Sequence, residues 1–177
     1  FKDAVGNEAS AVSDTIVFDN VVPDASSATV NDGSSTDIDV QASASVIKAN
    51  WTGFSDATSG IGTYQWAIGT TSGGTQTMGW TTATSPATAT GLSLTNGVTY
   101  YVSVKARDKA GNAYSSAATS DGVEVDTAAP TSNSIEIAND DTYTTSQTVT
   151  LTLASTGASY MKFQNGSGGY GSWVAYS

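Results

Sequence analysis

One stretch of the chain, residues 94–130, limits the possible folds more than any other. Its apolar residues recur at every second position, as Tyr100, Val102, Val104 and Ala106. Such alternation indicates a β-strand with one buried face, which the turn-forming residues Asp108–Asn112 then end. Val123 and Val125 begin a second alternating strand, and Pro130 closes the unit because proline cannot donate to a β-ladder. The stretch predicts the closing hairpin of a β-sandwich, followed by a linker.

The same pattern occurs near the N-terminus. Residues 1–7 match residues 106–112, with Asp3 at the position of Asp108, an offset of 108 − 3 = 105. Agreement at several positions with one offset indicates an internal repeat. A period near this value matches the roughly 100 residues of one immunoglobulin-type sandwich.

A second matching pair supports the repeat. Residues 13–23 match residues 120–130, with Asp19 at the position of Asp126, an offset of 126 − 19 = 107. The repeat divides the chain into three parts. We expect the final hairpin of a preceding domain in residues 1–22, a complete sandwich in residues 23–129 and the first half of a further domain in residues 130–177.

The middle part contains further alternating segments. Their core positions are Ile47, Ala49 and Trp51 in one segment and Tyr64, Trp66 and Ile68 in another. With the shorter segments around them, they make about seven strands, which suits one sandwich. The last part has similar segments, with Val149, Leu151 and Leu153 as an expected core strand. The fold class predicted is all-β.

Some residues carry a family resemblance. Trp51 resembles the core tryptophan of fibronectin type III domains, and Leu94 with Tyr100 resembles their tyrosine corner, in which the hydroxyl bonds back to the backbone near the leucine. The Asp-x-Ala-Gly-Asn turn and the linker Asp126–Pro130 are similar to tandem immunoglobulin-like repeats of large bacterial or archaeal surface proteins. The resemblance implies tandem Ig-like or fibronectin type III-like sandwiches, one complete and two partial, in an extracellular or cell-surface protein.

The composition excludes several classes of function. The chain has 6 basic and 16 acidic residues, a net charge of −10, which disfavours nucleic acid or an anionic membrane as a partner. It has no cysteine and no histidine, which excludes disulfides, thiolate or imidazole metal sites and a Ser-His-Asp triad. Its apolar runs are too short to insert into a membrane.

Oxygen ligands remain available for a hard cation. Asp19 and Asp126 stand just before linkers, and Asp56 lies in a loop between two core strands. In adhesin repeats with similar linkers, junction aspartates hold calcium that stiffens the rod. The resemblance therefore implies calcium at Asp126 and Asp19, with Asp56 as a third candidate ligand and no other cofactor. The alternative is that these aspartates only hydrogen-bond their own backbone in turns.

Catalysis is not expected. Asp37 and Asp39 would share one face of a strand, and Asp140 and Asp141 are adjacent. A glycosidase needs two carboxylates beside a cleft, one of them with a raised pKa, and nothing in the sequence places either pair under apolar cover. We interpret both pairs as solvated turn residues.

Two functions and two modes of assembly stay open. The first function is a stalk, spacer or filament segment of a surface protein, in contact with neighbouring repeats or other copies of the chain. The chain then either begins and ends inside domains of a longer polypeptide, or its N-terminal hairpin completes the C-terminal half-domain of another copy. The second function is a carbohydrate-binding accessory module of a secreted polysaccharide-degrading enzyme, which would stack glycans on exposed rings. The candidate rings are Trp80, Tyr101, Tyr114, Tyr170, Trp173 and Tyr176.

Overall fold

The computed structural model describes residues 1–164 and 166–177. The chain divides into two compact units, Phe1–Thr127 and Ala128–Ser177, and each is described by itself. The described residues form β-strands and one short 3-10 helix, η1 (Ala138–Asp140), with no α-helix among them. The predicted all-β class is therefore confirmed. Within this part of the chain no helix is long and apolar enough to cross a membrane.

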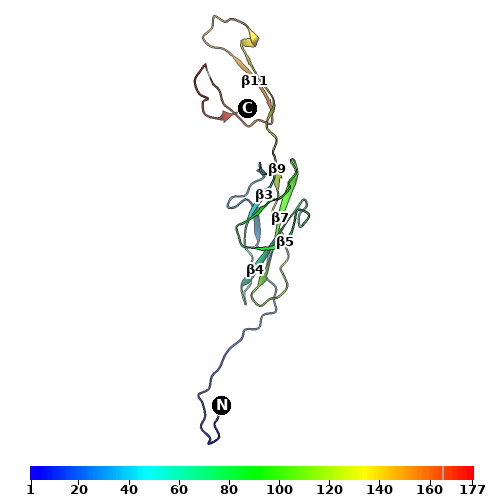
Figure 1. The fold of residues 1–177 in the computed structure, drawn as a ribbon, viewed down its shortest axis with the longest axis vertical. Helices are drawn as coiled ribbons and strands as arrows, with labels where there is room; N and C mark the ends of the chain where they lie inside the picture. The colour runs from blue at the N-terminus through cyan, green and yellow to red at the C-terminus, as the bar shows by residue number, and fades with distance from the viewer. Residues whose placement is uncertain (165) are drawn as a thin grey trace. The chain divides into compact units, whose positions relative to one another are not determined.

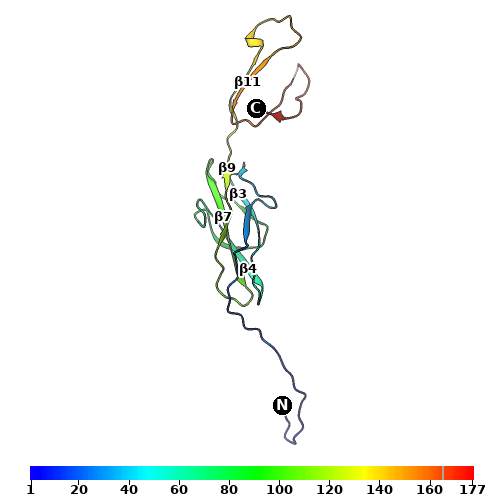
Figure 2. The same ribbon diagram turned by 180° about the vertical axis from the view of Figure 1, so that it is seen from behind.

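The first unit contains two sheets that are antiparallel except for one pair of strands. The smaller sheet has the order β1 (Thr29–Asp32), β3 (Val46–Thr52) and β6 (Ala87–Thr90). The larger sheet has the order β2 (Val40–Gln41), β9 (Val123–Val125), β7 (Thr99–Asp108), β4 (Ile61–Gly69) and β5 (Met78–Ala83), and β8 (Ala118–Thr119) also pairs with β7. Strands β2 and β9 are parallel. Figures 1 and 2 show the unit from opposite sides and place β3 and β7 in separate layers.

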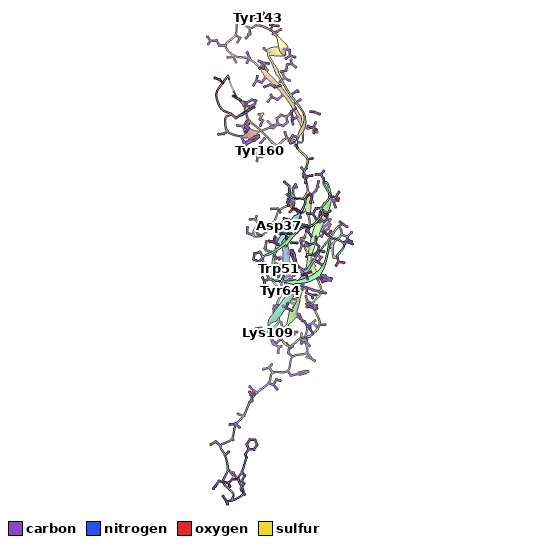
Figure 3. All side chains as sticks on the ribbon, viewed as in Figure 1. Asp37, Trp51, Tyr64, Lys109, Tyr143 and Tyr160 are labelled. Carbon is purple, nitrogen blue, oxygen red and sulfur yellow. The ribbon has the colours of Figure 1, made fainter. Side chains whose placement is uncertain are left out.

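The core of the first unit lies between these two sheets. The predicted inward positions of β7 are at most 4% exposed, and the predicted inward positions of β3 are buried as well. Trp51 of β3 packs against two rings of β4, with ring centroids 5.8 Å from Tyr64 and 6.2 Å from Trp66. Trp51 and Tyr64 are labelled in Figure 3. The alternation in the sequence therefore predicted the apolar layer of both sheets.

Two details of the first unit concern β7. The N–H of Thr95 donates to the hydroxyl of Tyr100 at 2.9 Å, which is the backbone contact expected near buried Leu94. Ser103 of β7 and Ala67 of β4 are fully buried, although they lie between the core positions that the alternation identified. The Ser103 hydroxyl shares a hydrogen bond with Thr119 of β8, a strand that the sequence did not predict.

The N-terminal copy of the repeat forms its turn but not its second strand. Lys2 and Glu8 form an isolated β-bridge and an ion pair at 3.4 Å. Ile16 and Phe18, which match β9 of the first unit, are 97% and 82% exposed. In the first unit β9 pairs with β7, whereas residues 13–19 of the N-terminal copy lie in no strand. The assignment of residues 1–22 to a preceding domain stays a prediction.

The second unit contains two small antiparallel pairs of strands. Strand β10 (Thr131–Ile137) pairs with β11 (Leu151–Thr156), and β12 (Tyr160–Met161) pairs with β13 (Val174–Ala175). The sequence predicted a core strand through Val149, Leu151 and Leu153, but Val149 and Leu151 are 40% and 41% exposed. The described residues of this unit supply no second layer to cover these side chains. The assignment of residues 130–177 to the first half of a further domain stays a prediction.

Candidate metal centre

Three carboxylates meet where residues 19–23 join the two-sheet part of the first unit. Asp19 belongs to this linker, Asp56 to the loop between β3 and β4, and Asp108 to the end of β7. One carboxylate oxygen from each lies within 4.8 Å of the other two. Ligands on opposite sides of a calcium ion are about 5 Å apart, because each oxygen lies about 2.3–2.6 Å from the ion. All three residues could therefore bind one ion, and we call them the junction cluster.

The loop after β3 wraps around the side chain of Asp56. The N–H groups of Thr58, Ser59 and Gly60 donate to its Oδ1 at 3.2, 2.8 and 2.8 Å. Partial burial opposes ionisation, but these N–H groups outweigh it and hold the pKa of Asp56 below its usual value. The loop thus fixes a charged oxygen ligand in place.

The turn after β7 holds Asp108 in a similar way. Its Oδ1 accepts from the N–H groups of Gly111 and Asn112 at 2.7 and 2.9 Å, and its Oδ2 accepts from the Asn112 amide at 2.9 Å. Burial works against ionisation of this 4% exposed residue, but the bonds from Asn112 and Gly111 lower its pKa. The carboxylate is therefore charged at neutral pH.

The N-terminal copy of this turn has the same pattern. Asp3 Oδ1 accepts from the Asn7 N–H and Asp3 Oδ2 accepts from the Asn7 amide, both at 2.8 Å. The Asn7 side chain is the main reason that the pKa of Asp3 is also lowered. The two copies of the sequence motif therefore adopt one local structure, and in each copy the asparagine amide binds the aspartate.

The linker is tied to both loops by hydrogen bonds. The side-chain amide of Asn112 donates to the backbone oxygens of Asp19 and Val21 at 3.2 and 3.1 Å. The Ser59 hydroxyl donates to Asp19 Oδ2, and the N–H of Ala110 donates to Ser59 Oγ at 3.3 Å. The direction in which the linker leaves the first unit is therefore set by side chains of that unit.

The structure brings together two of the three residues that the sequence singled out. Asp19 and Asp56 belong to the junction cluster, and Asp108 completes it. Asp126 does not belong to it. Val123 of β9 lies opposite Tyr100, near the start of β7, whereas Asp108 is the last residue of β7. Asp126 therefore lies at the other end of the larger sheet, where its N–H donates to the backbone oxygen of Gln41 at 2.9 Å. The repeated aspartate-to-asparagine turn was the signal that could have identified Asp108 and Asn112.

The junction cluster concentrates negative charge. Asp108 raises the pKa of Asp56 by repulsion, although hydrogen bonds outweigh this effect. No lysine or arginine in the described part of the chain forms an ion pair with the three carboxylates, although the positive charge of Arg107 also helps to lower the pKa of Asp108. A bound cation would offset the repulsion, and a set of oxygen ligands suits calcium or magnesium better than a transition metal.

The aromatic residues considered for glycan binding are in part covered by cations. The Lys105 ammonium lies 4.2 Å from the centre of the Trp80 ring and 4.7 Å from that of Tyr114. In the second unit, Lys162 lies 4.9 Å from the Tyr170 ring centre and 4.7 Å from that of Trp173. One face of each of these rings is therefore in contact with a charged side chain and is not open for a sugar.

Comparisons with protein-family models, with curated proteins and with solved structures find no match.

Proposed function

We propose that this chain is a non-catalytic segment of an extracellular or cell-surface spacer, built of tandem sandwiches of the immunoglobulin-like or fibronectin type III-like kind. Calcium at the junction cluster would stiffen the linker between neighbouring sandwiches. The observation that carries the proposal is the position of Asp19, a linker residue, against Asp56 and Asp108 of the unit that the linker joins.

The fold of the first unit supports the tandem-sandwich part of the proposal. Two sheets, antiparallel except for the β2–β9 pair, enclose one core, and their residues, Thr29–Val125, span about the length of one such sandwich. The hydrogen bond from Thr95 to Tyr100 corresponds to the tyrosine corner of these folds. The repeated turn of Asp3–Asn7 supports an array, since the same local structure recurs at the repeat offset.

The linker contacts support the mechanical part of the proposal. Sequential domains joined by a short linker move relative to one another unless contacts hold the linker. Asn112 and Ser59 already restrain Asp19 and Val21. An ion that binds the linker, the β3–β4 loop and the β7 turn at once would remove most of the remaining freedom, which is what a spacer requires.

The test is the motion of the linker with and without calcium. Heteronuclear {1H}-15N NOE values should rise for Asn20, Val21 and Val22 when calcium replaces chelator. Asp56→Asn should abolish the rise because it removes a charged ligand but keeps an oxygen for the loop N–H groups. Asp14→Asn is the matched control, since Asp14 is exposed, lies outside the junction cluster and accepts a hydrogen bond from the N–H of Thr15. Equal NOE values in calcium and in chelator would refute calcium stiffening at this junction.

A further inference from the structure

A second group of carboxylates lies inside the first unit. Asp32 ends β1, Asp37 follows in the segment that leads to β2, and Asp121 lies between β8 and β9. One carboxylate oxygen from each lies within 4.8 Å of the other two. We call Asp32, Asp37 and Asp121 the crossover cluster. Figure 3 places Asp37 toward the opposite end of the sheets from Lys109, the neighbour of Asp108, so this cluster is separate from the junction cluster.

The path of the backbone explains why Asp32 and Asp37 meet. Strand β1 belongs to the smaller sheet and β2 to the larger one, so residues 33–39 carry the chain from one sheet to the other. Gly33 starts this crossover at φ +104, and a Cβ atom there would lie 2.4 Å from the Thr36 oxygen. The Asp32 N–H then donates to Asp37 Oδ1 at 2.7 Å, and the Ile38 N–H donates to the backbone oxygen of Asp32 at 3.0 Å.

The turn before β9 brings the third carboxylate. Gly122 adopts φ +103, and a Cβ atom there would lie 2.7 Å from Thr99 Cγ2, so only glycine fits. Its N–H donates to Asp32 Oδ2 at 3.1 Å, which fixes the turn against the crossover. Asp121, the preceding residue, is thereby held next to Asp32.

The buried carboxylate of Asp32 has an oxygen without a partner. The residue is 0% exposed, and its Oδ1 has no hydrogen-bond partner in the described part of the chain. A buried polar atom in this condition destabilises a fold unless another group compensates. Burial raises the pKa of Asp32 to about 6, although the Ser120 hydroxyl and the Gly122 N–H lower it. Two further carboxylates face it, and no described basic side chain pairs with it.

We propose that the crossover cluster binds a calcium ion through Asp32, Asp37 and Asp121. The ion would supply the partner that Asp32 Oδ1 lacks and would offset the repulsion among three carboxylates. Asp37 and Asp121 are exposed, so water can complete the six to eight oxygens that calcium takes. The bound ion would connect the end of β1, in the smaller sheet, to the turn before β9, in the larger sheet. The site lies within one unit and is independent of the proposed spacer function.

Calorimetry can separate this site from the junction cluster. Calcium chloride is titrated into the full chain carrying Asp19→Asn and Asp56→Asn, which removes two of the three junction carboxylates. We expect calcium binding to remain in this background and to be lost when Asp37→Asn or Asp121→Asn is added. The control is Asp39→Asn, which changes the same charge at an exposed position of the same crossover and should leave binding unchanged. Absence of heat up to about 10 mM calcium, above the range of weak protein sites, would overturn the proposal.

A second measurement uses the unmodified chain. Calcium should shift the amide resonances of Gly33 and Gly122, since both flank the carboxylates of the crossover cluster. Shifts confined to the amides around Asp56 and Asp108 would mean that only the junction cluster binds, and the crossover proposal would be wrong while the proposed function stood. Shifts only at Gly33 and Gly122 would mean that only the crossover cluster binds calcium, so the crossover proposal would stand and calcium binding at the junction cluster would be wrong.

Discussion

Replacing Asp32 by asparagine should stabilise the calcium-free protein at neutral pH. Ionised Asp32 is completely buried with one unpaired oxygen, and its pKa is raised from 3.8 to about 6. A shift of about two units corresponds to about 3 kcal/mol of unfolding free energy at pH 7.5, since one unit is about 1.4 kcal/mol. Asparagine has nearly the same shape and carries no charge, so Asp32→Asn should recover up to about 3 kcal/mol.

The sign of the effect defines its pH window. The pKa of Asp32 is higher in the folded state, so the unfolded chain loses this proton first as the pH rises. Below the unfolded pKa of 3.8 the carboxyl is protonated in both states and imposes no penalty. The penalty grows as the pH rises toward the folded pKa of about 6 and is constant above it. The advantage of Asp32→Asn should therefore be small at pH 4 and complete at pH 7.5.

Urea unfolding in calcium-free buffer measures this difference. Trp173 is the only tryptophan of the second unit, so a Trp173→Phe background restricts the fluorescence signal to the first unit. Carboxylates outside the crossover cluster are common to both proteins and cancel in the comparison, whereas relief of the repulsion from Asp37 and Asp121 is part of the expected gain. Asp39→Asn controls for the change in net charge. An Asp32→Asn protein that is less stable than its parent at pH 7.5, or an advantage that does not change with pH, would refute the reasoning.

The remaining predictions concern the core and the linker. Trp51→Ala should lower the unfolding free energy by about 3–5 kcal/mol, as for other buried aromatics, and a loss below about 1 kcal/mol in urea unfolding would contradict the core described above. Tyr100→Phe should lower it by about 1 kcal/mol because one hydrogen bond to Thr95 is lost; an unchanged midpoint would mean that this contact contributes nothing. Asn112→Ala should increase proteolytic cleavage in the linker near Val21, since its amide holds the linker oxygens, and cleavage at the parent's rate would argue against that role.

The sequence was most informative where local periodicity decides the structure. The alternation in β7 and β3 identified their buried faces, because successive side chains of a strand point to opposite sides of the sheet. The same rule was misleading for Asp37 and Asp39, which were expected to share a strand face. They lie in the crossover before β2, where the backbone is not a strand and side chains do not alternate. The Asp37 carboxylate lies close to those of Asp32 and Asp121 instead.

The candidate sites needed information that periodicity does not contain. Asp19 and Asp56 could be singled out by their positions near a junction, but Asp108 joins them only because β7 runs from Thr99 toward that end of the unit. Asp32 and Asp121 are separated by 121 − 32 = 89 residues. They meet because the chain changes sheets after β1 and because Gly122 adopts a positive φ at a position where a Cβ atom would clash with Thr99. Such contacts depend on the topology of the whole unit.

The crossover cluster also bears on how the first unit responds to tension. In the proposed spacer, force reaches the unit through the linker before β1 and leaves it after β9. Strands β2 and β9 are parallel, and the N–H groups of Glu124 and Asp126 donate to the backbone oxygens of Asp39 and Gln41. Under tension the two strands would slide past one another and break these bonds together. An ion held by Asp32, Asp37 and Asp121 resists the same displacement, because it connects the segment before β2 to the turn before β9.

Single-molecule pulling on the full chain by its two ends checks this inference. We expect the unfolding force of the first unit to fall when calcium is replaced by chelator, and Asp121→Asn to give the lower force in both conditions. The Asp39→Asn control should keep the dependence on calcium, since its backbone oxygen still accepts from Glu124. A force that is independent of calcium in the unmodified chain would show that the β2–β9 pair and the core, without an ion, determine the mechanical stability.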